Sequence, residues 1–182
     1  MSNRVEVVFW DVQHGSATYI KTPNNRHIVV DLGTGKYSHA NTNTTFSPLQ
    51  YLKNAYNVSQ LDYVVITHPH RDHLDDIYNF SSLAPKVLCR PRGLSSDAIL
   101  KGGRSDDKDK LDKYMEISKS YSMDISEQSY DNPRNPDNWG GLNISTFRAT
   151  GCNQNNINNF IDNNLDYLVK PLKYRHFHKN DG

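Results

Sequence analysis

The sequence predicts an α/β fold that begins with antiparallel strands. Three short runs of β-branched and aromatic residues lie within residues 4–31, and polar turns rather than helices separate them. From Ser47 onward, a segment with helical spacing of apolar residues is followed by another apolar run, so helices and strands alternate. The order β-β-β-α-β-α indicates a mixed sheet with helices packed against it.

The first three strands are expected at Val5–Trp10, Ala17–Lys21 and His27–Asp31. The chain reverses first at Gln13–Ser16 and then at the polar pair Asn24–Asn25. Because the connections are this short, the three strands should form a meander.

A strand exit with two glycines follows at Asp31–Gly35, and we expect residues 36–46 to form a polar loop. Ser47 is a typical N-cap residue, and Pro48 suits the first position of a helix. The apolar residues that follow at helical spacing are Leu49, Leu52 and Tyr56.

A buried strand is expected at Leu61–Ile66, ending at Thr67, with a helix beginning at Leu74. The second half has weaker patterns, and its polar composition between Asn153 and Asn164, where seven of twelve residues are Asn, favours loops. The elements expected there are a strand at Val87–Cys89, an amphipathic helix at Asp106–Tyr121, a loop over residues 131–141 and a strand at Leu142–Phe147.

Composition narrows the function classes. Among 182 residues, 21 basic and 20 acidic side chains leave a net charge of +1. The overall charge therefore does not support electrostatic binding of nucleic acid across the whole protein surface. The longest apolar runs have four residues, too short to cross a bilayer, and the first residues carry no apolar signal region. The two cysteines, Cys89 and Cys152, form no CxxC pair. We therefore expect a cytoplasmic protein without a membrane partner.

One segment concentrates metal-ligand chemistry. His68, His70, Asp72 and His73 form an H-x-H-x-D-H pattern directly after the strand that ends at Thr67. Three imidazoles and a carboxylate suit zinc or another borderline divalent metal. Pro69 keeps His68 extended, so His68 and His70 should project to one side, while Asp72 and His73 turn the other way. The segment could also be a polar loop whose histidines cap backbone groups.

This segment and its context resemble the metallo-β-lactamase fold superfamily. The run from Val7 to Ala17, with Gln13-His14-Gly15-Ser16 at its centre, is similar to the first motif of the competence-protein (ComEC-like) branch, although Gln13, His14 and Ser16 depart from its usual residues. Val29–Gly33 is similar to the L-I-D-x-G that follows in that branch. The resemblance covers residues 4–80 well, fades through 85–150 and is absent after about residue 160.

The resemblance implies an αββα sandwich and a dinuclear zinc site, with manganese as an alternative metal. His68 and His70 would hold one ion, and Asp72 and His73 the second. Asp72 would also act in catalysis, near the metal-bound water. Asp31 would act indirectly, by orienting a ligand, and His14 is a candidate for the same cleft or a surface turn histidine.

The second half departs from the superfamily pattern. A complete fold would bring a further His, a bridging Asp in a G-D context and a final His, whereas this sequence has only His176 and His178 after His73. We therefore expect a metallo-β-lactamase-like domain over residues 1–160 that lacks the second half, and a divergent tail over 161–182. Ligation by the two tail histidines is the less favoured alternative.

These observations lead to two functional hypotheses. The first is a metal-dependent hydrolase of phosphodiester or nucleotide substrates. The alternative is a non-catalytic or truncated metal-binding remnant that serves as an interaction module. The apolar strands also need cover on both faces. We therefore expect either self-association or a tail that folds back through Leu165–Leu172 onto the sheet.

Overall fold

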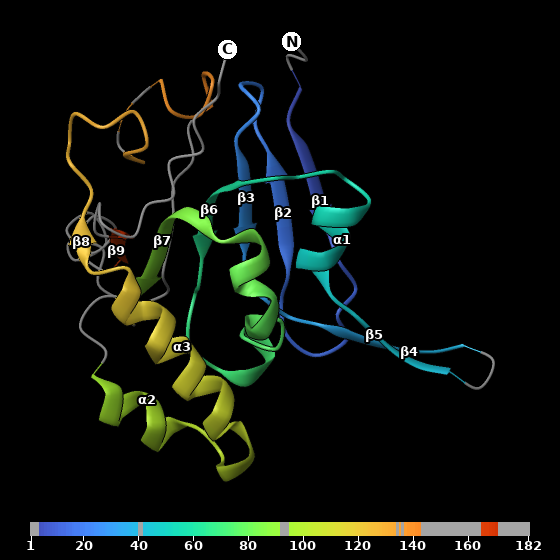
Figure 1. The fold of residues 1–182 in the computed structure, drawn as a ribbon. Helices are drawn as coiled ribbons and strands as arrows, with labels where there is room; N and C mark the ends of the chain where they lie inside the picture. The colour runs from blue at the N-terminus through green and yellow to red at the C-terminus, as the bar shows by residue number, and fades with distance from the viewer. Residues whose placement is uncertain are drawn as a thin grey trace, which may run out of the picture.

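A seven-stranded mixed sheet organises the chain (Figure 1). The computed structural model describes residues 4–39, 42–91, 95–133, 135, 137–142 and 165–170. The strand order is β1-β2-β3-β6-β7-β9-β8, and a separate hairpin pairs β4 with β5. The α/β class is confirmed. The strands are β1 Glu6–Phe9, β2 Thr18–Lys21, β3 His27–Val30, β4 Gly35–His39, β5 Thr42–Phe46, β6 Leu61–Val65, β7 Pro85–Pro91, β8 Met123–Asp124 and β9 Leu165–Val169.

Strand direction brings the important loops together. β1, β2 and β3 form the expected antiparallel meander, whereas β3, β6 and β7 run parallel. Val30 of β3 lies opposite Val65 of β6 in the register. The residues that follow these two strands, Asp31 and Thr67, therefore leave the sheet at the same edge.

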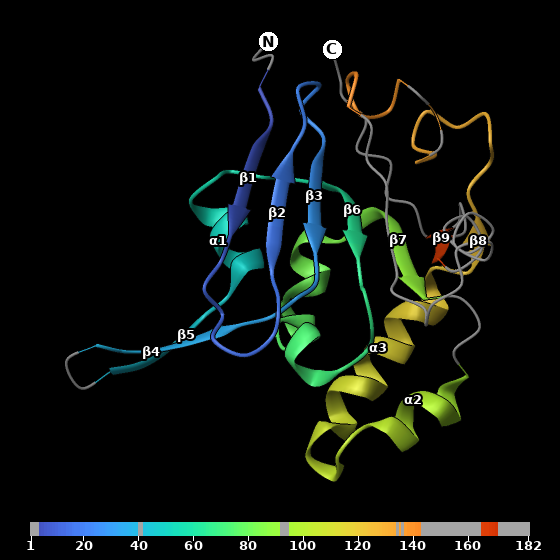
Figure 2. The same cartoon turned by 180° about the vertical axis from the view of Figure 1, so that it is seen from behind.

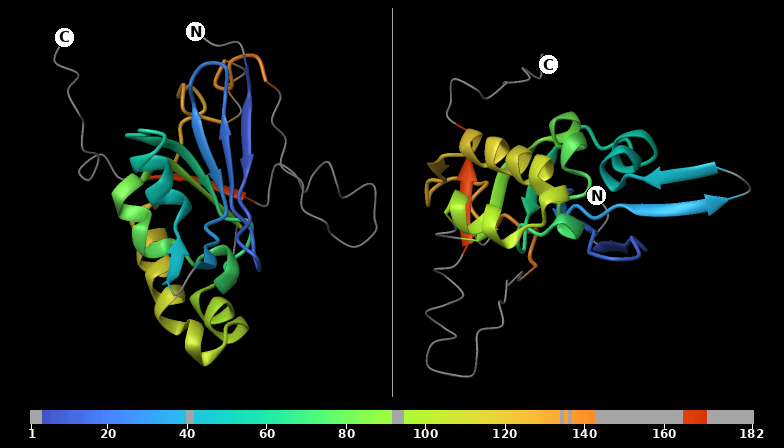
Figure 3. Two further views of the ribbon diagram at one scale, coloured as in Figure 1. Left: turned by 90° about the vertical axis from the view of Figure 1, so that its right-hand side faces the viewer. Right: turned by 90° about the horizontal axis from the view of Figure 1, so that it is seen from below.

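Helices cover one face of the sheet (Figures 2 and 3). The sheet side of this core is a row of cross-strand neighbours: Tyr19, Val29, Val64 and Leu88. The helices are α1 Pro48–Asn54, α2 Ser96–Gly102 and α3 Lys108–Ser120, and the 3₁₀ helices are η1 Arg71–His73, η2 Ile77–Leu83 and η3 Ser105–Asp107. Their buried apolar side chains in this core are Leu49, Leu52, Ile77, Phe80, Leu83, Leu111, Tyr114 and Ile117.

A non-helical segment covers part of the other face. Trp139 packs on Tyr63, with ring centroids 4.6 Å apart, within a second cluster of buried side chains. Arg26 holds the segment from below, because its Nη1 donates to Asp62 Oδ1 at 3.0 Å and to Asp131 Oδ1 at 2.5 Å. The described residues between Tyr130 and Leu142 thus cover part of β6 and β7.

Two predicted helices match the structure. The side chain of Ser47 caps α1 by accepting a hydrogen bond from the backbone N–H of Gln50 at 3.1 Å, and Pro48 is the first helical residue. The helix expected at Asp106–Tyr121 is α3, preceded by the turn η3. The patterns did not predict α2.

The expected polar loop over residues 36–46 is wrong, because the segment forms the β4–β5 hairpin. This hairpin projects away from the sheet (Figures 1 and 3). Because it covers no core, its strands do not require the alternating apolar side chains by which strands are predicted from a sequence. Its base is anchored to the body, where the ring centroids of Phe46 and Tyr51 lie 5.4 Å apart.

The helix expected from Leu74 is also wrong. The chain instead makes two 3₁₀ helices, η1 and η2, separated by turns. The backbone groups of this region are engaged elsewhere: Leu32 N–H donates to the carbonyl of His73 at 2.9 Å, and Asp76 N–H donates to that of Leu32 at 2.7 Å. These two bonds compete with continuous α-helical hydrogen bonding.

β9 lies within the stretch that we expected to be a divergent tail. It pairs antiparallel with β7 over five residues and with β8 on its other side, and Leu168 is buried in the helix-covered core. The tail therefore returns to the sheet at Leu165–Val169, but as an added strand beside β7 rather than as the expected cover for a face. The strand expected at Leu142–Phe147, apart from Leu142, lies outside the described residues, as do His176 and His178.

Candidate functional site

The H-x-H-x-D-H segment folds into one tight turn just beyond the carboxyl end of β6. The ring centroids of His68 and His70 are 4.6 Å apart, and those of His68 and His73 are 4.0 Å apart. His73 therefore returns toward His68 rather than turning the other way, because η1 reverses the chain within three residues. Asp72 joins the group, with its Oδ2 3.7 Å from His73 Nε2.

A buried carboxylate supports this cluster from behind. Asp31 is 2% exposed and follows β3 in a left-handed conformation, with φ of 59°. Its Oδ1 accepts a hydrogen bond from the Thr67 backbone N–H at 2.8 Å, and its Oδ2 lies 2.8 Å from His73 Nδ1. A contact of this kind would let Asp31 orient the His73 imidazole, which is the indirect role expected for Asp31.

Thr67 extends the same network, although no sequence pattern indicated its part. Its hydroxyl lies 2.7 Å from Asp31 Oδ2, to which it donates, and 3.1 Å from His68 Nδ1. When the Nδ1 atoms of both histidines are protonated, His68 donates to the Thr67 hydroxyl and His73 donates to Asp31 Oδ2. Each Nε2 atom then keeps a free lone pair. A neutral imidazole with a free Nε2 is the form that ligates a metal.

The electrostatic environment favours neutral imidazole at His68. Partial burial lowers the pKa of His68 below its ordinary 6.5, and the neighbouring His73 and His70 lower it further. The carboxylates of Asp31 and Asp72 act in the opposite direction. Burial has the larger effect, so the lone pair of the His68 ring stays available near neutral pH.

Two glycines let the surrounding loops close on the motif. A Cβ at Gly15, whose φ is 105°, would lie 2.1 Å from the carbonyl oxygen of Asp72. A Cβ at Gly33 would lie 2.7 Å from the carbonyl oxygen of Ser16 and 3.1 Å from that of Asp72. The glycines of both resembling motifs are therefore needed for close backbone approach around Asp72.

A cleft of about 790 Å³ opens beside the motif. His70 and Asp72 line it, and so does the exposed His14. Three cationic side chains that sequence reasoning missed also line it: Lys36, Arg71 and Arg104. These three residues come from separate segments of the chain, so no local sequence pattern could have predicted that they line the same cleft.

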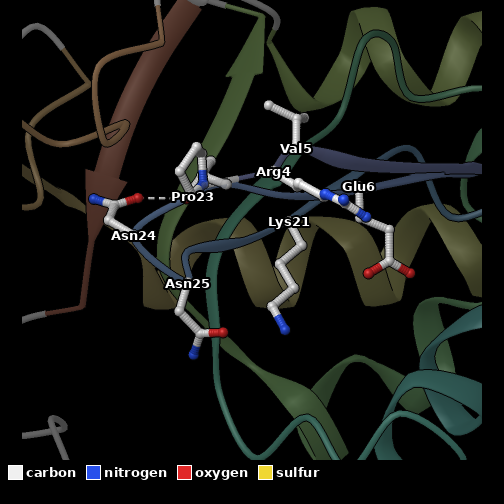
Figure 4. A pocket seen from close by; sticks show the side chains of 8 residues that line it. Arg4, Val5, Glu6, Lys21, Pro23, Asn24 and Asn25 are labelled. Atoms are coloured by element: carbon white, nitrogen blue, oxygen red, sulfur yellow. Dashed lines mark hydrogen bonds between the residues drawn. The ribbon is translucent and has the colours of Figure 1, made fainter. Parts of the chain in front are cut away.

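A second hollow lies at the opposite end of the strands. Figure 4 shows Arg4, Glu6 and Lys21 beside the turn Pro23–Asn25, which leads into β3. Because β3 runs from this turn toward Asp31, the hollow is far from the histidine cluster. Its charges are mixed, and no residue of the motif lines it.

Comparison with known families assigns the chain. The sequence model of the metallo-beta-lactamase superfamily matches residues 10–137, which include the whole histidine motif, Asp31 and His14. The chain belongs to the metallo-β-lactamase superfamily. The α/β arrangement agrees with a metallo-β-lactamase-like fold. No curated protein and no solved structure matches the chain significantly.

Membership of the metallo-β-lactamase superfamily supports metal-dependent hydrolysis, and the superfamily commonly binds metal ions, usually zinc. Within the described part of the chain, no three His, Cys, Asp or Glu side chains form a ready metal-binding group. The donors nevertheless fit zinc by their chemistry, because imidazole nitrogens and a carboxylate lie together on one turn. Among the described helices, none is long and apolar enough to cross a membrane.

Proposed function

We propose that the protein is a metal-dependent hydrolase that cleaves phosphodiester or nucleotide substrates. The observation that carries this proposal is the gathering of three imidazoles and Asp72 on one turn at the side of a cleft. Buried Asp31 and exposed Thr67 orient two of the imidazoles. Ligands supported in this way by carboxylates and hydroxyls are typical of functional metal sites.

In this proposal His68 and His70 hold one ion, while Asp72 and His73 hold the second. The metal is zinc, with manganese as the alternative, and when bound it supplies a water of lowered pKa and polarises the scissile group. Asp31 fixes the tautomer of His73 through its 2.8 Å contact with Nδ1. Asp72 holds the attacking water in place and accepts its proton.

The substrate class rests on the resemblance of Val7–Ala17 and Val29–Gly33 to the competence-protein branch. The size of the cleft supports this substrate class, because a volume of about 790 Å³ accommodates a nucleotide-sized ligand. Cationic side chains along the cleft also suit a phosphoryl group.

Metal content tests the site. Replacing His68 and His70 together by Ala should abolish retention of zinc, measured by atomic emission on the purified chain, because one ion loses both of its imidazoles and the other keeps only two protein ligands. The matched control replaces His176 and His178 by Ala and should leave the metal content unchanged. Unchanged zinc in the first variant, or loss of zinc in the control, would show that the ligands are assigned wrongly.

Turnover tests the reaction. The wild-type chain, loaded with zinc or manganese, should hydrolyse bis(4-nitrophenyl) phosphate, and Asp72→Asn should lose more hydrolysis than metal, since an amide cannot accept a proton from bound water. Wild-type-like turnover by Asp72→Asn would refute the role of Asp72. A metal-loaded wild-type chain without hydrolysis would favour the non-catalytic metal-binding module.

A further inference from the structure

The cleft beside the histidine motif is lined by charged side chains from three separate elements. Lys36 lies on β4, Arg71 within η1, and Arg104 directly before η3. The carboxylates along the same cleft are Asp72, Asp75 and Asp107. Formal charge therefore cancels, and the effective charge depends on which groups already pair with one another.

Arg71 is engaged by the carboxylates. Its Nε lies 3.5 Å from Asp75 Oδ1, and its Nη1 lies 3.5 Å from Asp107 Oδ1. Asp75 is also paired with Lys110, which does not line the cleft. Two of the three carboxylates are thus neutralised, and the third, Asp72, belongs to the metal motif.

Lys36 and Arg104 are the other two cationic side chains that line the cleft. Both are exposed, and neither forms an ion pair within the part of the chain that the structure describes. Their backbones are fixed: the carbonyl of Lys36 accepts a hydrogen bond from Gln13 Nε2 at 2.7 Å, and Arg104 N–H donates to Asp107 Oδ2 at 3.3 Å. Their positive groups are therefore free to bind a ligand, while the positions that carry them are held.

We propose that Lys36 and Arg104 determine substrate specificity by binding the non-bridging oxygens of a small phosphoester, whose scissile bond is presented to the histidine motif. This inference rests on the proposed function and deepens it. A lysine ammonium supplies a compact charge, and an arginine guanidinium binds two oxygens of one phosphate at once. Asp75 and Asp107 do not compete for these two cations, because Asp75 is paired with Arg71 and Lys110 and Asp107 with Arg71.

The test compares Lys36→Met, Arg104→Met and their combination with a matched control, Lys119→Met. Lys119 is exposed at the end of α3, so the control removes the same charge away from the cleft. The first readout is binding of inorganic phosphate by calorimetry to the full chain, after treatment with a chelator so that metal does not contribute. The second is the ratio of kcat/KM for bis(4-nitrophenyl) phosphate to that for the neutral ester 4-nitrophenyl acetate.

We expect each single variant to weaken phosphate binding and lower the ratio roughly tenfold, since charge-assisted hydrogen bonds are lost. The combined variant should lose more, and Lys119→Met should behave as wild type. If the wild-type chain does not hydrolyse the phosphodiester but phosphate binding still depends on Lys36 and Arg104, the proposed function and the specificity role both fail, and only the assignment of the two residues as a phosphate-binding pair stands. Hydrolysis and phosphate binding that are equal in the combined variant and the control would overturn it, as would a wild-type chain that binds no phosphate.

Discussion

Gly15 illustrates how one residue sets the geometry of the site. It lies in the first loop, far in sequence from the histidines, yet a Cβ there would collide with the Asp72 carbonyl oxygen at 2.1 Å. The motif resemblance marked this loop as important, but only the structure gives the reason. The backbone of Gly15 packs directly against the turn that carries Asp72 and the motif histidines.

Gly15→Ala should therefore destabilise the chain and weaken zinc binding. Gly141→Ala is the matched control, because Gly141 also has a positive φ, 86°, but a Cβ there would have no heavy atom within 4 Å. The control should cost about 1 kcal/mol of unfolding free energy from backbone strain alone. Gly15→Ala should cost about 1–3 kcal/mol more, from overpacking. Urea unfolding and zinc titration measure both, and equal effects of the two substitutions would contradict the packing argument.

At the scale of elements, the sequence predicted what repeats locally. Strands with a buried apolar side and the Ser47-Pro48 helix start were found, because side-chain period and capping chemistry are local properties. The β4–β5 hairpin escaped detection because it stands away from the core. The motif residues stand out by their spacing, and Thr67 directly precedes them, whereas Lys36 and Arg104 reach the same cleft only through the fold.

The β2–β3 pair predicts a pH effect. The Tyr19 hydroxyl lies 2.7 Å from His27 Nδ1, and burial lowers the pKa of His27 below its ordinary 6.5. The charges around it act in both directions: Asp62 and Glu6 raise the pKa, while Lys21 and Lys86 lower it.

Because the folded pKa is lowered, the unfolded chain binds more protons as pH falls below about 6.5, and stability is lost there. His27→Gln should lose less unfolding free energy than wild type between about pH 7.5 and pH 5.5, since that imidazole no longer titrates. Urea unfolding at both pH values measures the difference, with His14→Gln as a control that removes an exposed imidazole. A parallel pH dependence in wild type and His27→Gln would rule out this contribution.

At the scale of the whole molecule, the sheet is completed by a strand from the far end of the chain. Between β7 and β8 lies β9, which supplies five register pairs to β7 and buries Leu168 at 6% exposure among the residues of the helix-covered core. Without it, β7 would become an open edge that carries the buried Val87 and Leu88. Such an edge is a template for pairing with another chain.

Deleting residues 161–182 should therefore lower the unfolding free energy and cause concentration-dependent association, because it removes β9 and opens the edge of β7. Deleting only residues 171–182 is the matched control, since it keeps β9 and Lys170, whose Nζ lies 5.0 Å from the Tyr121 ring centroid. Sedimentation velocity and dye binding at several protein concentrations distinguish the two truncations. The longer deletion should sediment as larger species and bind the dye, whereas the shorter one should match the full chain. If the chain lacking 161–182 stayed a stable monomer, β1 to β7 with their helices would close the core without β9, and the sheet would need no strand beyond β7.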